Sequence, residues 1–185
     1  MKTKNLILIA LFAAMTTVGA FLNIPTPTVP FSLQFFFCAY AGVLLGAKRG
    51  FTSQLLYVAI GLVGLPVFTK GGGISYIFQP SFGFLLGFIT CAFIIGLIVE
   101  GSRKPGIIRM SLAVFAGLST IYIIGVPYLY YMVNYLAAPG KEISFTTAIA
   151  WGFTPFILFD VIKAVIVVIT SLKILPILRK QGFIQ

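Results

Sequence analysis

The chain has 185 residues, of which 59% are hydrophobic and 9% are charged. Soluble domains carry roughly 25% charged residues. The composition therefore predicts an all-α integral membrane protein that forms one domain over residues 1–185. With no histidine and three acidic residues, we expect no metal site, no cofactor and no catalytic residues. The net charge is +10, but the basic residues lie in short loops rather than on one soluble face, which argues against a nucleic-acid partner.

Six apolar stretches are candidate membrane-spanning helices. They cover residues 5–22, 32–47, 51–65, 81–99, 107–135 and 145–175. We expect Pro127 to kink or interrupt the fifth helix, because proline lacks a backbone donor. The first stretch follows Lys2 and Lys4 and also has features of a cleavable signal peptide. The distribution of charge favours the alternative, an uncleaved first helix.

Lysine and arginine are distributed unevenly between alternate loops. With the N-terminus inside, ten of the 13 basic residues fall on the cytoplasmic side, two fall outside, and Lys163 falls within the sixth stretch. The cytoplasmic residues are Lys2, Lys4, Lys48, Arg49, Arg103, Lys104, Arg109, Lys173, Arg179 and Lys180, and the outer ones are Lys70 and Lys141. Because cytoplasmic loops are enriched in basic residues, we expect six transmembrane helices in one bundle in membrane lipid, with both termini cytoplasmic.

Two outer loops have sequences that disfavour helix. Residues 23–30 contain three prolines, and residues 64–80 contain the run 71–73 of three glycines. Irregular backbone near membrane depth is tolerated where protein or water satisfies its polar groups, so these loops predict a lidded cavity that opens outward. Gly72 and Gly73 form either a flexible turn or a backbone surface that approaches a ligand closely.

Asp160 and Lys163 are the charged residues of the run 145–172 within the sixth stretch, three positions apart and therefore on one helix face. Charges at bilayer depth are costly and commonly mark a ligand or ion site. Three interpretations follow: a structural ion pair, a recognition site for a polar ligand, or part of a proton relay. Buried pairs are seldom retained for stability, and neighbouring helices offer no further ionisable groups for a relay. Ligand recognition is therefore the favoured interpretation.

Other candidate binding residues lie near the outer boundary. Phe31, Gln34, Tyr76, Gln79 and Trp151 combine aromatic walls with uncharged polar groups, as small-molecule pockets do. Tyrosine and tryptophan at this depth also serve as interface anchors.

The first stretch carries small residues at i and i+4. Ala10 and Ala14 either allow close packing within the bundle or dock a partner subunit, because small residues let helices approach closely.

Several segments together resemble the BioY family. They are residues 30–34, residues 61–68 followed by the glycines, residues 80–87, and Pro155-Phe156 followed by Asp160, Lys163 and Ala164. The resemblance covers about residues 5–175. It implies the six-helix fold of a biotin-specific S component of an energy-coupling factor (ECF) transporter in a bacterial cytoplasmic membrane, with biotin as the transported ligand. It also implies partners: a membrane T component, docked on the alanine face of the first helix, and two ABC-type ATPase subunits.

The resemblance leaves the orientation of the ligand open. In one arrangement Asp160 accepts a hydrogen bond from the ureido ring of biotin and Lys163 pairs with its carboxylate. In the other, the two residues bond to each other and both contact one end of the ligand, since i,i+3 side chains start about 5–6 Å apart. Alternative functions are an S component for another small vitamin, a stand-alone small-solute transporter and an intramembrane enzyme; the lack of histidine disfavours the enzyme.

Overall fold

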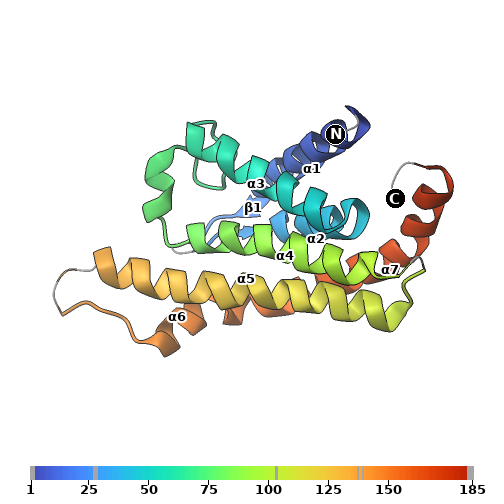
Figure 1. Ribbon diagram of the computed structural model, residues 1–185. Coiled ribbons are helices and arrows are strands. Elements are labelled where there is room, and N and C mark those ends of the chain that lie inside the picture. Colours follow the sequence, from blue (N-terminus) through green and yellow to red (C-terminus); the bar gives the residue numbers. More distant parts are fainter. Residues whose placement is uncertain (1–2, 27–28, 103, 137, 139, 183–185) are drawn as a thin grey trace.

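The computed structural model describes residues 3–26, 29–102, 104–136, 138 and 140–182, and it is mostly helical (Figure 1). Lys2, Pro27 and Arg103 of the sequence predictions lie outside the described residues. The helices are α1 (Thr3–Phe21), α2 (Gln34–Leu45), α3 (Ala47–Val63), α4 (Phe82–Glu100), α5 (Ile107–Leu136), α6 (Phe145–Gly152) and α7 (Thr154–Lys180). Two short strands, β1 (Asn23–Ile24) and β2 (Phe31–Ser32), and a 3-10 helix, η1 (Ile74–Phe78), complete the described elements.

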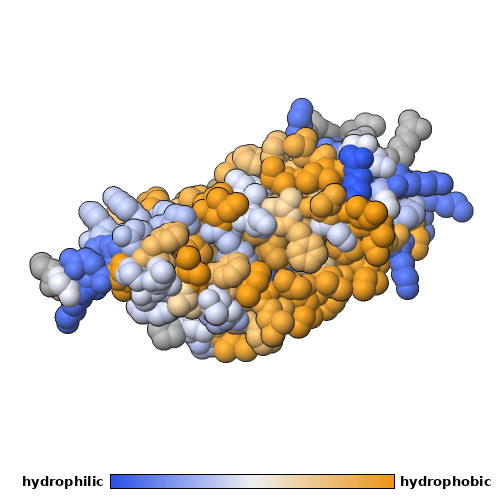
Figure 2. All heavy atoms as spheres, turned by 90° about the horizontal axis from the view of Figure 1, so that it is seen from below, coloured by the Kyte–Doolittle hydropathy of each residue, from blue (hydrophilic) through white to orange (hydrophobic). Residues whose placement is uncertain are grey.

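The helices α1, α4, α5 and α7 are long and apolar enough to cross a membrane, whereas α2 and α3 have 12 and 17 residues. Apolar atoms cover the middle of the face in Figure 2, and hydrophilic atoms gather toward its ends. The expectation of a multi-pass helical membrane protein is thus supported. Six spans, and the side on which the termini lie, remain predictions.

The start of α1 and the end of α7 lie at the same end of the bundle (Figure 1). Lys4 Nζ donates a hydrogen bond to the carbonyl of Gly182, just beyond α7. This arrangement is expected when a chain crosses the membrane an even number of times, because the chain then returns to the side from which it started.

Helix α4 forms the centre of the bundle and packs against α2, α3 and α5. Its glycines permit this close packing. A Cβ atom at Gly96 would lie 2.2 Å from the backbone nitrogen of Ala47, and one at Gly87 would lie 2.7 Å from the Cα of Ile121. Small residues that let backbones approach are the usual basis of tight helix packing in membranes. At these two glycines the backbone of α4 therefore lies in direct contact with α3 and α5.

The predicted helix over residues 145–175 is wrong as a continuous element, because it is divided into α6 and α7 at Phe153. Pro155 lies in the first turn of α7, where a missing N–H leaves no hydrogen bond unmade. Further inside a helix the same proline would remove a hydrogen bond. By contrast, α5 continues through Pro127, so of the two outcomes expected there, a kink or an interruption, the interruption does not occur.

The two outer loops carry more structure than their sequences indicate. Residues 23–24 and 31–32 form an antiparallel ladder in which Ile24 pairs with Phe31. In the second loop, Gly73 N donates to Gly61 O over 2.7 Å, and a Cβ at Gly72 would lie 2.1 Å from Leu65 O. These contacts hold the glycine segment against the end of α3.

Candidate functional site

A cavity lies between the outer loops and the helices α2, α4, α5 and α7. It contains about 580 Å³ of empty space, its open mouth included. Its walls come from both outer loops, from η1 and from the break between α6 and α7. The lining residues are Val29, Pro30, Phe31, Ser32, Gln34, Phe35, Thr69, Tyr76, Ser81, Phe84, Leu85, Phe88, Ile121, Tyr122, Gly152, Phe156, Asp160 and Lys163.

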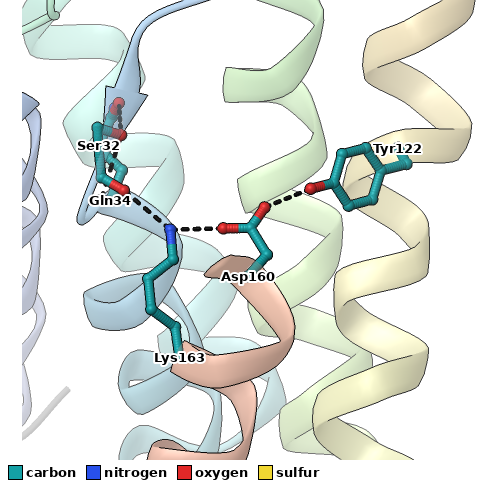
Figure 3. A network of polar contacts seen from close by, with 5 residues as sticks. All are labelled: Ser32, Gln34, Tyr122, Asp160 and Lys163. Carbon is teal, nitrogen blue, oxygen red and sulfur yellow. Dashed lines mark hydrogen bonds and ion pairs between the residues drawn. The ribbon is translucent and has the colours of Figure 1, made fainter. Parts of the chain in front are cut away.

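Asp160 and Lys163 form a direct ion pair in this cavity (Figure 3). Lys163 Nζ lies 2.5 Å from Asp160 Oδ1, and the two side chains are 12% and 13% exposed. Lys163 Nζ also donates to the backbone carbonyl of Ser32 over 3.0 Å. Tyr122 OH donates to Asp160 Oδ2. Two elements, β2 and α5, therefore supply partners for the pair of charges on α7.

The position of the pair follows from where α7 begins. Because α7 starts at Thr154, Asp160 and Lys163 fall in its first turns, beside the β1–β2 hairpin. The Phe31 ring of the hairpin packs on Phe156 at a centroid distance of 5.0 Å. Lys163 Nζ lies 5.8 Å from the centroid of the same Phe31 ring, within the range of a cation–π contact. The hairpin and the start of α7 thus hold each other in place.

Gln34 belongs to a second chain of hydrogen bonds. Its Nε2 donates to Tyr57 OH over 2.7 Å, and its Oε1 accepts from Ser32 Oγ over 2.9 Å. Tyr57 OH donates in turn to Val67 O over 3.1 Å. Both ends of the Gln34 amide have protein partners, and the residue is 4% exposed. This chain joins β2, α2 and α3 to the second outer loop.

The structure brings together Asp160, Lys163, Gln34, Tyr76 and Phe31, all of which line the cavity. Whether they contact a ligand remains a prediction.

The other predicted site residues lie elsewhere in the described part of the chain. Gln79 is exposed after η1, Trp151 is 40% exposed on α6, and Gly72 and Gly73 pack on the end of α3; none of the four lines the cavity. Their contact with a ligand also remains a prediction.

Ala10 and Ala14 are exposed on α1, so they do not pack inside the bundle formed by the described residues. The neighbouring Ala13 and Gly19 face inward and are buried. Partner docking by the exposed pair stays a prediction.

Sequence reasoning missed Tyr122, Ser32, Thr69 and Ser81 as cavity residues. Tyr122 lies in a long apolar helix, and its hydroxyl meets Asp160 only after α5 and α7 have packed. A weak signal was available, because a tyrosine in the interior of a spanning helix needs a hydrogen-bond partner. The hydroxyls of Thr69 and Ser81 flank the predicted residue Tyr76, but serines and threonines are too common in loops to stand out.

The cavity offers recognition groups rather than reactive ones. Within the described ranges, no group of three or more His, Cys, Asp or Glu side chains could hold a metal ion. A carboxylate and an ammonium in a partly enclosed apolar cavity interact strongly with the polar groups of a ligand, because solvent screening is reduced there. Aromatic rings supply the remaining walls. This arrangement suits the capture of a small molecule that has both apolar and polar parts.

Comparison with known proteins places the chain among transporters. A sequence model described as the BioY family matches residues 1–180. The chain is 37% identical over 172 residues to the biotin transporter BioY of Thermotoga maritima, covering 92% of this chain and 95% of that protein. It is 32% identical over 175 residues to the biotin transporter BioY2 of Lactococcus lactis subsp. cremoris, covering 94% and 91%.

Its fold resembles a solved structure, the crystal structure of the S-component for biotin from an ECF-type ABC transporter. The TM-score is 0.68 at 27% sequence identity, and the match covers 94% of this chain and 91% of that one.

Because Asp160 and Lys163 form an ion pair, the effect of substituting one of them on the free energy of unfolding should depend on whether the other is present. Lys163→Met leaves the Asp160 carboxylate in the cavity without its counter-ion, and we expect this to lower the free energy of unfolding by about 3 kcal/mol. The double variant Asp160→Asn/Lys163→Met should be less destabilised than Lys163→Met alone. The measurement is unfolding in detergent micelles without ligand.

Lys173→Met is the matched control, because Lys173 is exposed on the same helix; its effect should stay within about 0.5 kcal/mol. Purely additive effects of the two cavity substitutions would show that the ion pair is not formed in the unliganded protein.

Proposed function

Because the chain belongs to the BioY family, we propose that it is a substrate-binding subunit that captures biotin from the extracellular side for import by an ECF-type ABC transporter. The observation that carries this proposal is the Asp160–Lys163 pair inside an aromatic cavity beneath the two outer loops. The relatives are transporters, and the function is therefore binding and transport rather than enzymatic turnover.

The chemistry of the cavity fits biotin. The ligand has an apolar bicycle, a ureido group with two N–H donors and a carbonyl, and a carboxylate on a flexible chain. Phe35, Phe84, Phe88 and Phe156 supply apolar surface for the bicycle and the chain. Asp160 accepts hydrogen bonds and Lys163 donates them. Another small vitamin as the substrate has less support, because relatives at 37% and 32% identity are biotin transporters.

The proposal includes the partners that energise import. The matching S-component comes from an ECF-type ABC transporter, so we assign to this chain a membrane T component and two ABC-type ATPase subunits. Ala10 and Ala14 provide a smooth, exposed face on α1 for docking to the T component. The protein by itself should bind biotin, and energised uptake should require these partners.

The proposed topology has six spans, with both termini in the cytoplasm of a bacterial cell, and the whole chain 1–185 acts as one substrate-binding domain. The contact between Lys4 and Gly182 supports an even number of crossings. The basic residues outside the apolar stretches support the orientation. Helices α2 and α3, which meet at Gly46, would form the second and third spans although each is short.

Purified protein should bind biotin in titration calorimetry, and both Asp160→Asn and Lys163→Ala should weaken binding by about 100-fold. The reason is that hydrogen bonds to charged groups contribute about 1.5–3 kcal/mol each, and each substitution also disturbs the partner charge. Lys173→Ala on the same helix is the control and should bind like the parent. A folded parent protein that fails to bind biotin would reject the assignment, whereas binding that survives both substitutions would make the pair structural.

The topology can be tested with single cysteines introduced at Lys141 and at Lys104. A membrane-impermeant maleimide added to intact cells should label Lys141→Cys and should not label Lys104→Cys until the membrane is opened. Cys38 and Cys91 are buried, so the background should be low. Labelling of both positions from outside would contradict the proposed six spans.

Docking can be tested by enlarging the alanine face. Ala14→Trp should leave biotin binding intact but should abolish co-purification with co-expressed T component and ATPases, because the large ring prevents close helix approach. Ala150→Trp, on an exposed position of α6, is the matched control. Equal co-purification of the two variants would mean that this face of α1 does not bind the partner.

A further inference from the structure

An open groove lies on the surface of α3 and α4, and it shares no lining residue with the substrate cavity. It contains about 540 Å³ of empty space, its open side included, and it is lined by Lys48, Phe51, Thr52 and Phe93. The rings of Phe51 and Phe93 meet edge to face at a centroid distance of 6.1 Å, and they are 37% and 36% exposed. We refer to these four residues as the lysine groove.

The lysine groove has a charged end and an apolar side. Lys48 lies in the first turn of α3. Leu55 is seven residues further on, about 10 Å along the helix axis, and it is 45% exposed. On α4, Leu97 follows Phe93 by one turn and is 54% exposed. Because α4 is long and apolar enough to cross a membrane, this surface suits an amphiphile whose chain lies along the helices and whose head group lies at Lys48.

The ammonium of Lys48 is available to such a head group. Lys48 is exposed, and among the described residues its ammonium makes no ion pair or hydrogen bond. Thr52 Oγ1 donates its proton to the backbone carbonyl of Lys48 over 2.7 Å. The ammonium therefore keeps its three N–H donors for a ligand, and the groove supplies no carboxylate of its own.

The charges around the start of α3 favour an anion. Arg49 Nη1 donates to Asn5 Oδ1 over 3.1 Å, so the start of α3 adjoins the start of α1. Lys104 follows the end of α4 and is exposed. Glu100 is the acidic residue here, and a Cβ atom at Gly46 would lie 1.8 Å from its Oε1. Three basic residues, Lys48 included, thus face one carboxylate, and this excess attracts negative charge.

We infer that the lysine groove binds an anionic phospholipid, with the lipid phosphate at Lys48 and an acyl chain against Phe51 and Phe93. Basic pockets between membrane helices on the cytoplasmic side recognise anionic head groups in this way. The proposed topology assigns the lipid to the cytoplasmic leaflet. The site itself does not depend on biotin, and it adds a lipid partner to the proposed function.

The test is native mass spectrometry of the purified, delipidated protein without biotin. Dioleoyl phosphatidylglycerol and dioleoyl phosphatidylcholine have the same chains and differ in net charge, and the first should bind about fivefold more tightly. Lys48→Gln should lower the affinity for phosphatidylglycerol about fivefold and leave that for phosphatidylcholine unchanged, whereas Lys48→Arg should retain the preference. Lys173→Gln, at an exposed position of α7, is the matched control and should bind both lipids like the parent.

The acyl chain is tested separately from the head group. Phe93→Ala should weaken both lipids about threefold, because it removes apolar contact from the chain. Phe115→Ala, at a 37% exposed position of α5, is the matched control and should have no effect. Glycerol 3-phosphate carries the phosphate without acyl chains, and it should not displace phosphatidylglycerol at equal concentration. Thermal unfolding checks that every variant is folded.

Three results would overturn the inference. Equal affinities of the parent for the two lipids would show that the groove does not select an anion. Equal losses in Lys48→Gln and Lys173→Gln would show attraction by the basic surface as a whole rather than by this groove. Displacement by glycerol 3-phosphate would indicate an anion site that does not need a lipid. Because biotin is absent from these measurements, each result leaves the proposed biotin binding untouched, and failure to bind biotin would leave the lipid site standing.

Discussion

The contact between Asp160 and Lys163 is the constraint on which the outer half of the protein depends. Two charges in an apolar bundle are tolerated only if their hydrogen-bonding capacity is largely met. The pair meets it with the hydroxyl of Tyr122 and the carbonyl of Ser32. These partners come from α5 and from the hairpin, so satisfying one ion pair fixes three elements around one cavity. The capacity that remains unmet is what a ligand can use.

The break at Phe153 makes this arrangement possible. A continuous helix over residues 145–175 would carry Pro155 in its interior and lose a backbone hydrogen bond there. The break instead places Pro155 in the first turn of α7. It also lets Gly152 and Phe156, on either side of the break, line the cavity. At α4, Gly87 and Gly96 allow backbone contacts that close the bundle. Irregular backbone is thus concentrated around the cavity, whereas the close contact of Gly96 with Ala47 lies toward the other end of α4.

Much of this could be predicted from sequence, because apolar runs, isolated charges and proline-rich loops are strong local signals. The helical membrane fold, the shared face of Asp160 and Lys163, and the involvement of both outer loops followed from such signals. The break at Phe153 was missed although Gly152 and Pro155 are local signals for it, because the apolar run continues on both sides. The roles of Tyr122, Thr69 and Ser81 depend on which helices and loops meet in space. Gln34 was recognised as a cavity residue, but its bond to Tyr57 needed the packing of α2 on α3.

Helix α1 connects the proposed docking face to the cavity, because its opposite faces have different neighbours. Ala10 and Ala14 point away from the bundle, whereas Gly19 packs so closely on the chain before α2 that a Cβ there would lie 2.9 Å from Leu33 O. Leu33 N also donates to Gly19 O over 3.0 Å. The residue before Leu33 is Ser32, whose carbonyl accepts from Lys163. A partner that binds the alanine face therefore contacts the same helix that anchors the hairpin at the ion pair. This continuity gives a displacement of α1 a direct physical route to the cavity.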